Sequence, residues 1–261
     1  MAGLFSAVSR SRPARTMSKT VTVLTGVGSF LYTFHVLYRF MCFASSHNDN
    51  QRSMIHYEIT HGVVLSAMYM LLVDACLLSL FMLQHSFMAS DVVKNVYYKL
   101  NLEDVQRSIY NAASAGVLHF LMSNWCPVPS YALWDVETSE SNGLWLLFTS
   151  FHVLGWFIVY SGCIMMDISE LAGLKQVYYK LSARPCPLSI KSRELQRYYA
   201  HMRHPSFTGF LMILWIHPFM TLDRFLLSSI LTVYMIMMWT IDHEDYLYHA
   251  TSVQLKRRHL S

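Results

Sequence analysis

Six long apolar stretches constrain this chain more than any other feature of its sequence. A helix that crosses a bilayer needs about 20 predominantly apolar residues. The stretches approach or exceed that length at 20–44, 61–84, 106–125, 143–166, 206–221 and 224–241. Only 14% of the 261 residues are charged, whereas soluble domains carry about a quarter. The sequence therefore predicts an all-α, polytopic membrane helix bundle with about six transmembrane helices.

These stretches divide the chain into three regions. Residues 1–19 form a basic tail, 20–250 a six-span membrane domain with a long loop at 167–205, and 251–261 a basic C-terminal tail. The third stretch is the most polar of the six. The fifth is short, so it either stands nearly upright in the bilayer or stops at His217 and Pro218.

The basic residues predict the orientation of the spans. Lysine and arginine gather in loops on the cytoplasmic side of membrane proteins. With both termini on the cytoplasmic or nucleoplasmic side, all but three of the 20 lysines and arginines fall on that side; the exceptions are Arg39, Arg52 and Arg224. Cys42 and Cys126 then lie near the opposite face, where they either pair or remain free thiols.

The loop at 167–205 is rich in aromatic and basic residues. Its segments 173–181 and 195–205 each combine tyrosine with lysine or arginine. Such side chains suit the membrane interface, because their apolar stems enter the lipid and their polar tips stay in water. We expect two helical segments there, lying on the interface or dipping into it.

Basic side chains stand directly before the fifth stretch. Pro205 suits the first turn of a helix, where its missing N–H would be unpaired anyway. A helix N-terminus attracts negative charge, so Arg203 and His204 predict a point that binds carboxylate or phosphate. Phe207 would offer an aromatic wall, and Gly209 allows close approach to the backbone. The alternative is a lipid-headgroup anchor.

Acidic side chains follow the sixth stretch, at Asp242, Glu244 and Asp245, with His243 among them. The fifth and sixth stretches are joined by a short turn. The start of one and the end of the other are therefore neighbours, which brings these residues near Arg203. The alternative is ordinary ion pairing that closes the bundle.

Asp74 is the conspicuous charge within a span. A carboxylate in a bilayer is costly and usually faces a partner or a wet cavity. His119 and His152 are candidate partners, although a core histidine with its own hydrogen bonds is the simpler interpretation. Gln84, His85 and Ser86 end the second stretch at the cytoplasmic face, where polar residues can serve simply as helix-end hydrogen bonders. The sequence holds neither a dinucleotide fingerprint nor a P-loop, and its cysteines form no C-x-x-C pair.

Five segments occur in one order across nearly the whole chain: LQHSFMAS (83–90), QRSIYNAAS (106–114), LAGLKQVYYKL (171–181), MRHPSFTGF (202–210) and WTIDHEDYLYHA (239–250). Together they resemble the nurim family of multi-pass inner-nuclear-membrane proteins. That family is in turn similar to methanethiol S-methyltransferases and isoprenylcysteine carboxyl methyltransferases. The resemblance implies an isoprenylcysteine-methyltransferase-like helix bundle at the nuclear envelope.

The resemblance also implies a cofactor site for S-adenosylmethionine. In those enzymes the R-H-P-x-[YF]-x-G element and a later acidic pair bind the cofactor. Carried over, the site residues are Tyr199, Arg203, His204, Pro205, Phe207, Gly209, Asp242 and His243. His243 replaces the second acidic residue, and Arg197 stands where a glycine is expected. The motif is therefore partly eroded.

Three hypotheses about function follow. The first is a structural or interaction role at the nuclear envelope, with the lipid bilayer and envelope or lamina components as partners. The second is an active methyltransferase acting on a small or lipophilic thiol or carboxylate. A transporter ranks last, since it rests on Asp74 and buried histidines alone. No specific nucleic-acid binding is indicated, because the N-terminal charges serve equally as a signal for membrane topology.

Overall fold

The computed structural model describes residues 19–46, 63–185, 187–192, 206–237 and 254. The elements in chain order are α1 (Lys19–Ser45), α3 (Val63–Ala89), α4 (Asp91–Leu100), α5 (Glu103–Ser123), β1 (Ala132–Asp135), α6 (Asn142–Met165), α7 (Ile168–Leu171), α8 (Leu174–Leu181), a 3₁₀ turn η1 (Pro187–Ile190), α10 (Phe207–Trp215), β2 (Phe219–Thr221) and α11 (Leu222–Met237). The predicted all-α class is confirmed, with one small addition: β1 and β2 form an antiparallel pair.

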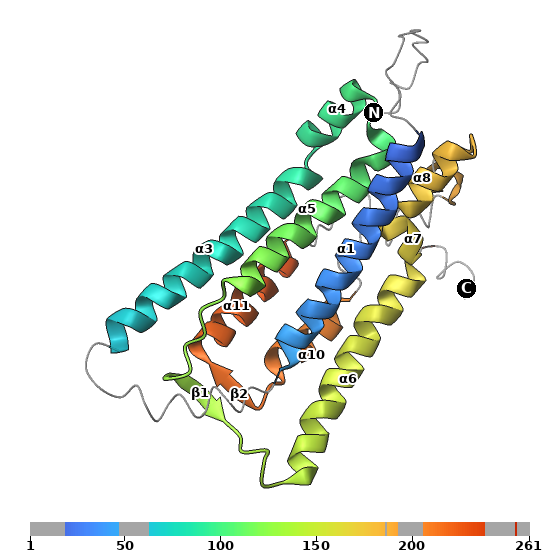
Figure 1. Cartoon of the computed structure of the whole chain (residues 1–261). Helices are drawn as coiled ribbons and strands as arrows, with labels where there is room; N and C mark the ends of the chain where they lie inside the picture. Colours follow the sequence, from blue (N-terminus) through green and yellow to red (C-terminus); the bar gives the residue numbers. More distant parts are fainter. Residues whose placement is uncertain (1–18, 47–62, 186, 193–205, 238–253, 255–261) are drawn as a thin grey trace.

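The long helices run side by side as a bundle (Figure 1). α5 packs along α1 and α3, α10 packs against α6 and α11, and α11 also contacts α3. Figure 1 shows α4, α7 and α8 gathered at one end and the β1–β2 pair at the other. We call these the α4/α8 end and the β end.

Two apolar clusters form the core. One is built on Leu77, Leu78, Leu121, Leu214, Leu227 and Met235. The second joins Phe40 and Ala44 of α1 to Trp156 and Val159 of α6 and Ile213 of α10. α10 therefore contributes to both clusters and links the two halves of the bundle.

The outer surfaces of the long helices are strongly apolar. Leu65 of α3 is 78% exposed, Phe157 of α6 is 68% exposed, and Met165 is 76% exposed. Exposed apolar surface on this scale marks contact with lipid. Helices α1, α3 and α6 are long and apolar enough to cross a membrane. α5 is more polar, and the described parts of α10 and α11 are shorter.

The predicted fifth stretch at 206–221 is not one continuous helix. α10 ends at Trp215, and β2 begins at Phe219. A residue before proline is disfavoured in the α conformation, and His217 precedes Pro218. The His217 side chain also lies 2.9 Å from the carbonyl of Phe219 through Nδ1. The second of the two alternatives, a stop at His217–Pro218, agrees with the structure.

Two carboxylates fasten the segment after α5 at the β end. Asp74 of α3 is fully buried and accepts the backbone N–H of Cys126 at 2.9 Å. Asp223 of α11 accepts the Trp125 indole N–H and the Val128 backbone N–H, both at 3.0 Å. These carboxylates replace the water that the backbone donors would otherwise bind.

His119 and His152 were candidate partners for Asp74, and the structure shows both of them hydrogen-bonded to other groups. His152 lies 3.2 Å from the Ser45 hydroxyl and 2.9 Å from the Ile216 carbonyl. His119 lies 3.5 Å from the Tyr32 hydroxyl. The simpler interpretation, core histidines with their own hydrogen bonds, fits both. Cys42 and Cys126 are free thiols, the second of the two alternatives given for them.

Candidate functional site

The structure describes two of the eight predicted cofactor residues, Phe207 and Gly209, at the start of α10. The other six, Tyr199, Arg203, His204, Pro205, Asp242 and His243, lie outside the described residues. The described part of the candidate site consists of the start of α10 and the polar groups of the neighbouring helices.

α10 begins inside the bundle, not at its surface. Ser206, the residue before the helix, is 4% exposed, and its hydroxyl donates to the Val159 carbonyl of α6 at 3.0 Å. Phe207 is half-buried and packs against the core cluster that contains Leu77 and Met235. The aromatic face of Phe207 is therefore in contact with the protein core.

Gly209 brings α10 into backbone contact with α6. A Cβ atom added at Gly209 would lie 2.5 Å from the Gly155 carbonyl oxygen and 3.1 Å from the Val159 nitrogen. A Cβ at Gly155 would lie 3.1 Å from the Gly209 carbonyl oxygen. Small residues at facing positions let membrane helices approach closely. The group that approaches the Gly209 backbone is thus helix α6. The predicted place of Gly209 at a cofactor stays a prediction.

A polar cluster joins α3, α5 and α11 in the half of the bundle toward the α4/α8 end. The Tyr110 hydroxyl lies 2.8 Å from His85 Nε2, and the Ser114 hydroxyl lies 3.3 Å from His85 Nδ1. The Ser86 and Tyr234 hydroxyls are 3.0 Å apart. An imidazole between hydroxyl groups can accept and return a proton. Sequence reasoning noticed His85 and Ser86 but missed Tyr110 and Tyr234, which lie on other helices.

Phe207 and the polar cluster share one apolar wall. Phe81 packs against the same core cluster as Phe207, and its ring centroid lies 5.6 Å from that of His85. The start of α10 and the His85 cluster are therefore both connected to this core cluster.

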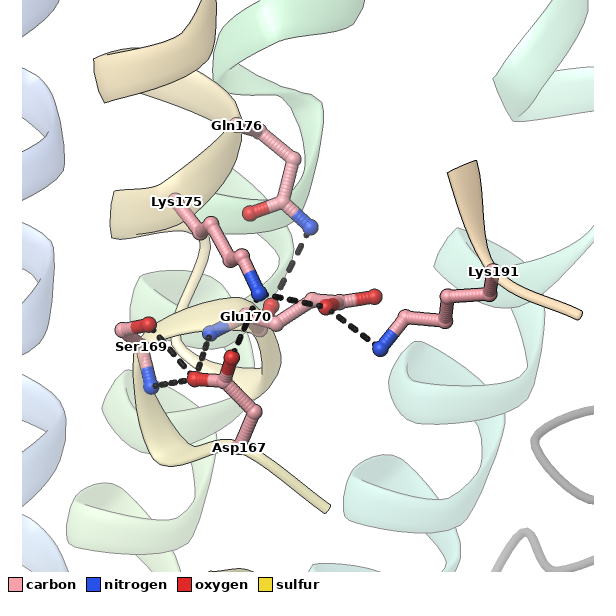
Figure 2. A network of polar contacts seen from close by, with 6 residues as sticks. All are labelled: Asp167, Ser169, Glu170, Lys175, Gln176 and Lys191. Atoms are coloured by element: carbon pink, nitrogen blue, oxygen red, sulfur yellow. Dashed lines mark hydrogen bonds and ion pairs between the residues drawn. The ribbon is translucent and has the colours of Figure 1, made fainter. Parts of the chain in front are cut away.

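An ionic network lies at the α4/α8 end, in the connection after α6 (Figure 2). Asp167 has a φ of 61° and caps α7, accepting the backbone N–H groups of Ser169 and Glu170 at 3.1 and 3.3 Å. Lys175 Nζ lies 2.6 Å from Asp167 and 3.5 Å from Glu170. Lys191 Nζ lies 2.9 Å from the same Glu170 oxygen. As Figure 2 shows, Glu170 is held between the two lysines.

These contacts shift the pKa values of two groups. The hydrogen bond from Lys175, with help from the Ser169 hydroxyl, lowers the pKa of Asp167 from 3.8 to about 2. The same bond raises the pKa of Lys175 above its ordinary value. Both groups are therefore charged at neutral pH, and the network fixes the first part of the predicted 167–205 loop.

The network is docked on α5 and α1. The Leu171 carbonyl accepts from Asn111 Nδ2 at 2.7 Å and from Arg107 Nε at 3.2 Å. Gly173, at φ 88°, lies so close to α5 that an added Cβ would be 2.8 Å from the Ser108 nitrogen. Val177 of α8 is buried against Gly26 of α1. The predicted helical segment at 173–181 is confirmed as α8; the second, at 195–205, lies outside the described residues.

The fold and these sites define the class of the protein: a polytopic helix bundle that packs in a lipid bilayer, with a structured connection docked across one end. The particular family comes from similar proteins. The chain is 40% identical over 248 residues to the nurim homolog of Drosophila pseudoobscura pseudoobscura, covering 94% of this chain and 98% of that protein. It is 36% identical over 247 residues to the nurim homolog of Drosophila melanogaster, with the same coverage.

The similarity to a vertebrate relative covers a smaller share of the chain. Nurim of Bos taurus is 37% identical over 191 residues, 72% of each chain. Neither a protein-family model nor a solved structure matches the chain. The chain belongs to the nurim family.

Proposed function

We propose that this protein is a multi-pass protein of the inner nuclear membrane with a structural or interaction role. Support comes from its nurim relatives and from the bilayer-facing helices. The partners would be the lipid bilayer and components of the nuclear envelope or lamina. Both termini would lie on the cytoplasmic or nucleoplasmic side.

The charges of the described residues support this orientation. Lys94 and Lys99 of α4, Arg107 near the start of α5, and Lys175 and Lys180 of α8 belong to elements at the α4/α8 end. The segment from β1 to the start of α6, near the β end, carries Asp135, Glu137 and Glu140 and no lysine or arginine. By the positive-inside rule, the α4/α8 end would face the nucleoplasm.

One observation carries the choice of a structural role over catalysis. Gly209 is a residue that the methyltransferase resemblance places at the cofactor, yet its open side is filled by the backbone of α6. A glycine used for helix packing has a sufficient reason to be there without a cofactor.

Localisation tests this proposal. We would express the full-length chain with a small tag in cultured cells and compare it with a marker of the endoplasmic reticulum. A rim around the nucleus that survives detergent extraction of the outer membranes is the expected result. An even reticular pattern would contradict the proposed location.

The His85 cluster favours a second candidate, an S-adenosylmethionine-dependent methyltransferase. A thiolate or carboxylate of the acceptor would attack the methyl carbon, and the bond from that carbon to the sulfonium sulfur would break, leaving a neutral thioether. A thiol acceptor must first lose its proton, and His85, whose Nε2 lies 2.8 Å from the Tyr110 hydroxyl, would be the group that takes it. Arg203, His204 and Asp242 would hold the cofactor, with Tyr199, Pro205, Phe207, Gly209 and His243 around them.

Calorimetry of the purified protein with S-adenosylmethionine decides between the two. Binding that is lost in His204→Ala, with unchanged thermal stability of the cofactor-free variant, would support the methyltransferase. If millimolar S-adenosylmethionine produces no heat of binding and no rise in melting temperature, the result would contradict the methyltransferase and favour the structural role. Ser139→Ala, on the exposed loop at the β end, is the control variant.

A further inference from the structure

α4 differs from the other described helices near it because none of its ten residues is buried. Val93 and Tyr97 are half-buried, and the remaining eight residues are exposed. A ten-residue helix is marginal by itself in water. Most helices of this size are stabilised by packing an apolar face against the protein, so another environment must support α4.

The exposed residues of α4 are segregated by chemistry. Val92, Val96 and Leu100 follow one another at intervals of four and form one row on the helix. They are 68%, 49% and 57% exposed. Asp91, Lys94, Asn95, Tyr98 and Lys99 occupy the rest of the exposed surface, and Lys94 pairs with Asp91 at 2.8 Å. This is the pattern of a helix with one apolar and one hydrated side.

The chain holds both ends of α4 at the boundary of the bundle. α3, a helix long and apolar enough to span a bilayer, ends at Ala89, two residues before α4 begins. α5 begins at Glu103, three residues after α4 ends, and packs along α3. Because both neighbouring helices pack in the bundle, α4 is held at the end of the bundle, close to the membrane surface.

The caps show that α4 is a defined helix. The Ser90 hydroxyl accepts the backbone N–H of Val93 at 3.5 Å. Asn101 adopts the left-handed conformation at φ 55°, and its N–H bonds to the carbonyls of Tyr97 and Tyr98. Asparagine is one of the few residues that tolerates this conformation.

We propose that α4 is an interfacial helix that inserts the Val92–Val96–Leu100 row into the bilayer leaflet at the α4/α8 end. The occupant of this apolar face is lipid. Lys99 lies beside the row on the helix and extends its ammonium group toward the headgroups, while its stem covers apolar surface. Anchored in this way, α4 fixes how deep the α3–α5 pair lies in the membrane.

Cysteine labelling in the full-length chain tests this inference. In a background with the five native cysteines replaced by serine, single-cysteine variants Val96→Cys and Asn95→Cys are reconstituted into phosphatidylcholine vesicles that also contain phosphatidylserine. The two positions are adjacent in sequence but lie on the apolar and polar sides of α4. A polar maleimide reacts with thiols in water and not with thiols among acyl chains.

We expect Val96→Cys to react on the order of tenfold more slowly than Asn95→Cys, the factor that corresponds to burying one valine-sized side chain. The two rates should become equal in denaturing detergent. Equal rates in vesicles would overturn the proposal. A slow rate at position 96 that disappears when the protein is diluted into more lipid would also overturn it, because a second copy would then be covering the row.

Discussion

Replacing Gly209 with alanine tests the close packing of α10 on α6. A Cβ at this position would lie 2.5 Å from the Gly155 carbonyl oxygen, 2.9 Å from Val159 Cγ2 and 3.1 Å from the Val159 nitrogen. Two of these three contacts are with backbone atoms, which cannot rotate away. The two helices must therefore separate, and the contacts of Ile213 and Phe210 in the core would loosen with them.

The expected magnitude combines two opposing effects. Overpacking of this kind costs about 1–3 kcal/mol. Alanine is intrinsically better than glycine within a helix by about 0.5–1 kcal/mol. We therefore expect Gly209→Ala to lower the free energy of unfolding by about 1–2 kcal/mol. Gly155→Ala should cost less, because its nearest neighbour at 2.8 Å is a side-chain atom of Ile213.

Thermal unfolding of the purified, cofactor-free protein in lipid nanodiscs measures this effect. Gly28→Ala is the matched control, since nothing lies within 4 Å of a Cβ at that position of α1. It should raise the stability by about 0.5–1 kcal/mol, the intrinsic advantage of alanine over glycine within a helix. If Gly209→Ala were as stable as Gly28→Ala, the packing argument would be refuted, and the assignment of Gly209 to a cofactor would regain its basis.

Three further variants test other parts of the structure. Gly173→Ala should detach α7 and α8 from α5, since its φ of 88° and the 2.8 Å approach to the Ser108 nitrogen both exclude a side chain; faster proteolysis within 167–192 is the measurement, with Gly143→Ala as control. Asp167→Asn should remove an acid-sensitive contribution to stability: because the folded-state pKa is lowered from 3.8 to about 2, that contribution is complete above 3.8 and is lost as the pH falls toward 2. As the pH is lowered through this range, the melting temperature should therefore fall more steeply for the native chain than for the variant. An equal pH dependence of the two melting temperatures would contradict the lowered pKa of Asp167. Tyr110→Phe should cost about 1 kcal/mol through the lost hydrogen bond to His85, and an unchanged melting temperature would mean that the bond adds no stability.

The sequence predicted the helices well where composition alone determines them. The apolar stretches at 20–44, 61–84 and 143–166 correspond to α1, α3 and α6 within a few residues. The stop near Pro218 followed from local stereochemistry. The same logic could not reveal β1, because its pairing with β2 depends on residues more than 80 positions away.

The side-chain partners were less predictable for a physical reason. Pairing Asp74 with a histidine assumed that a charged group seeks another titratable side chain, but its acceptor oxygen takes a backbone N–H at Cys126. Backbone donors occur at every residue except proline, so a sequence pattern cannot single one out. Likewise, Gly209 signals a close approach, but the identity of the approaching group, α6, is a property of the tertiary structure.

The two carboxylates at the β end have a consequence for biogenesis. Asp74 is made early and Asp223 late, yet both are needed to hold the backbone that follows α5. While the ribosome is still synthesising the chain, the indole N–H of Trp125 and the backbone N–H of Val128 have no carboxylate from α11 to accept their hydrogen bonds. The first helices can enter the membrane one after another. The segment after α5 reaches its final structure only when α10 and α11 have been inserted and Asp223 is in place. A nascent chain stalled before residue 222 would therefore leave these two donors without their native acceptor.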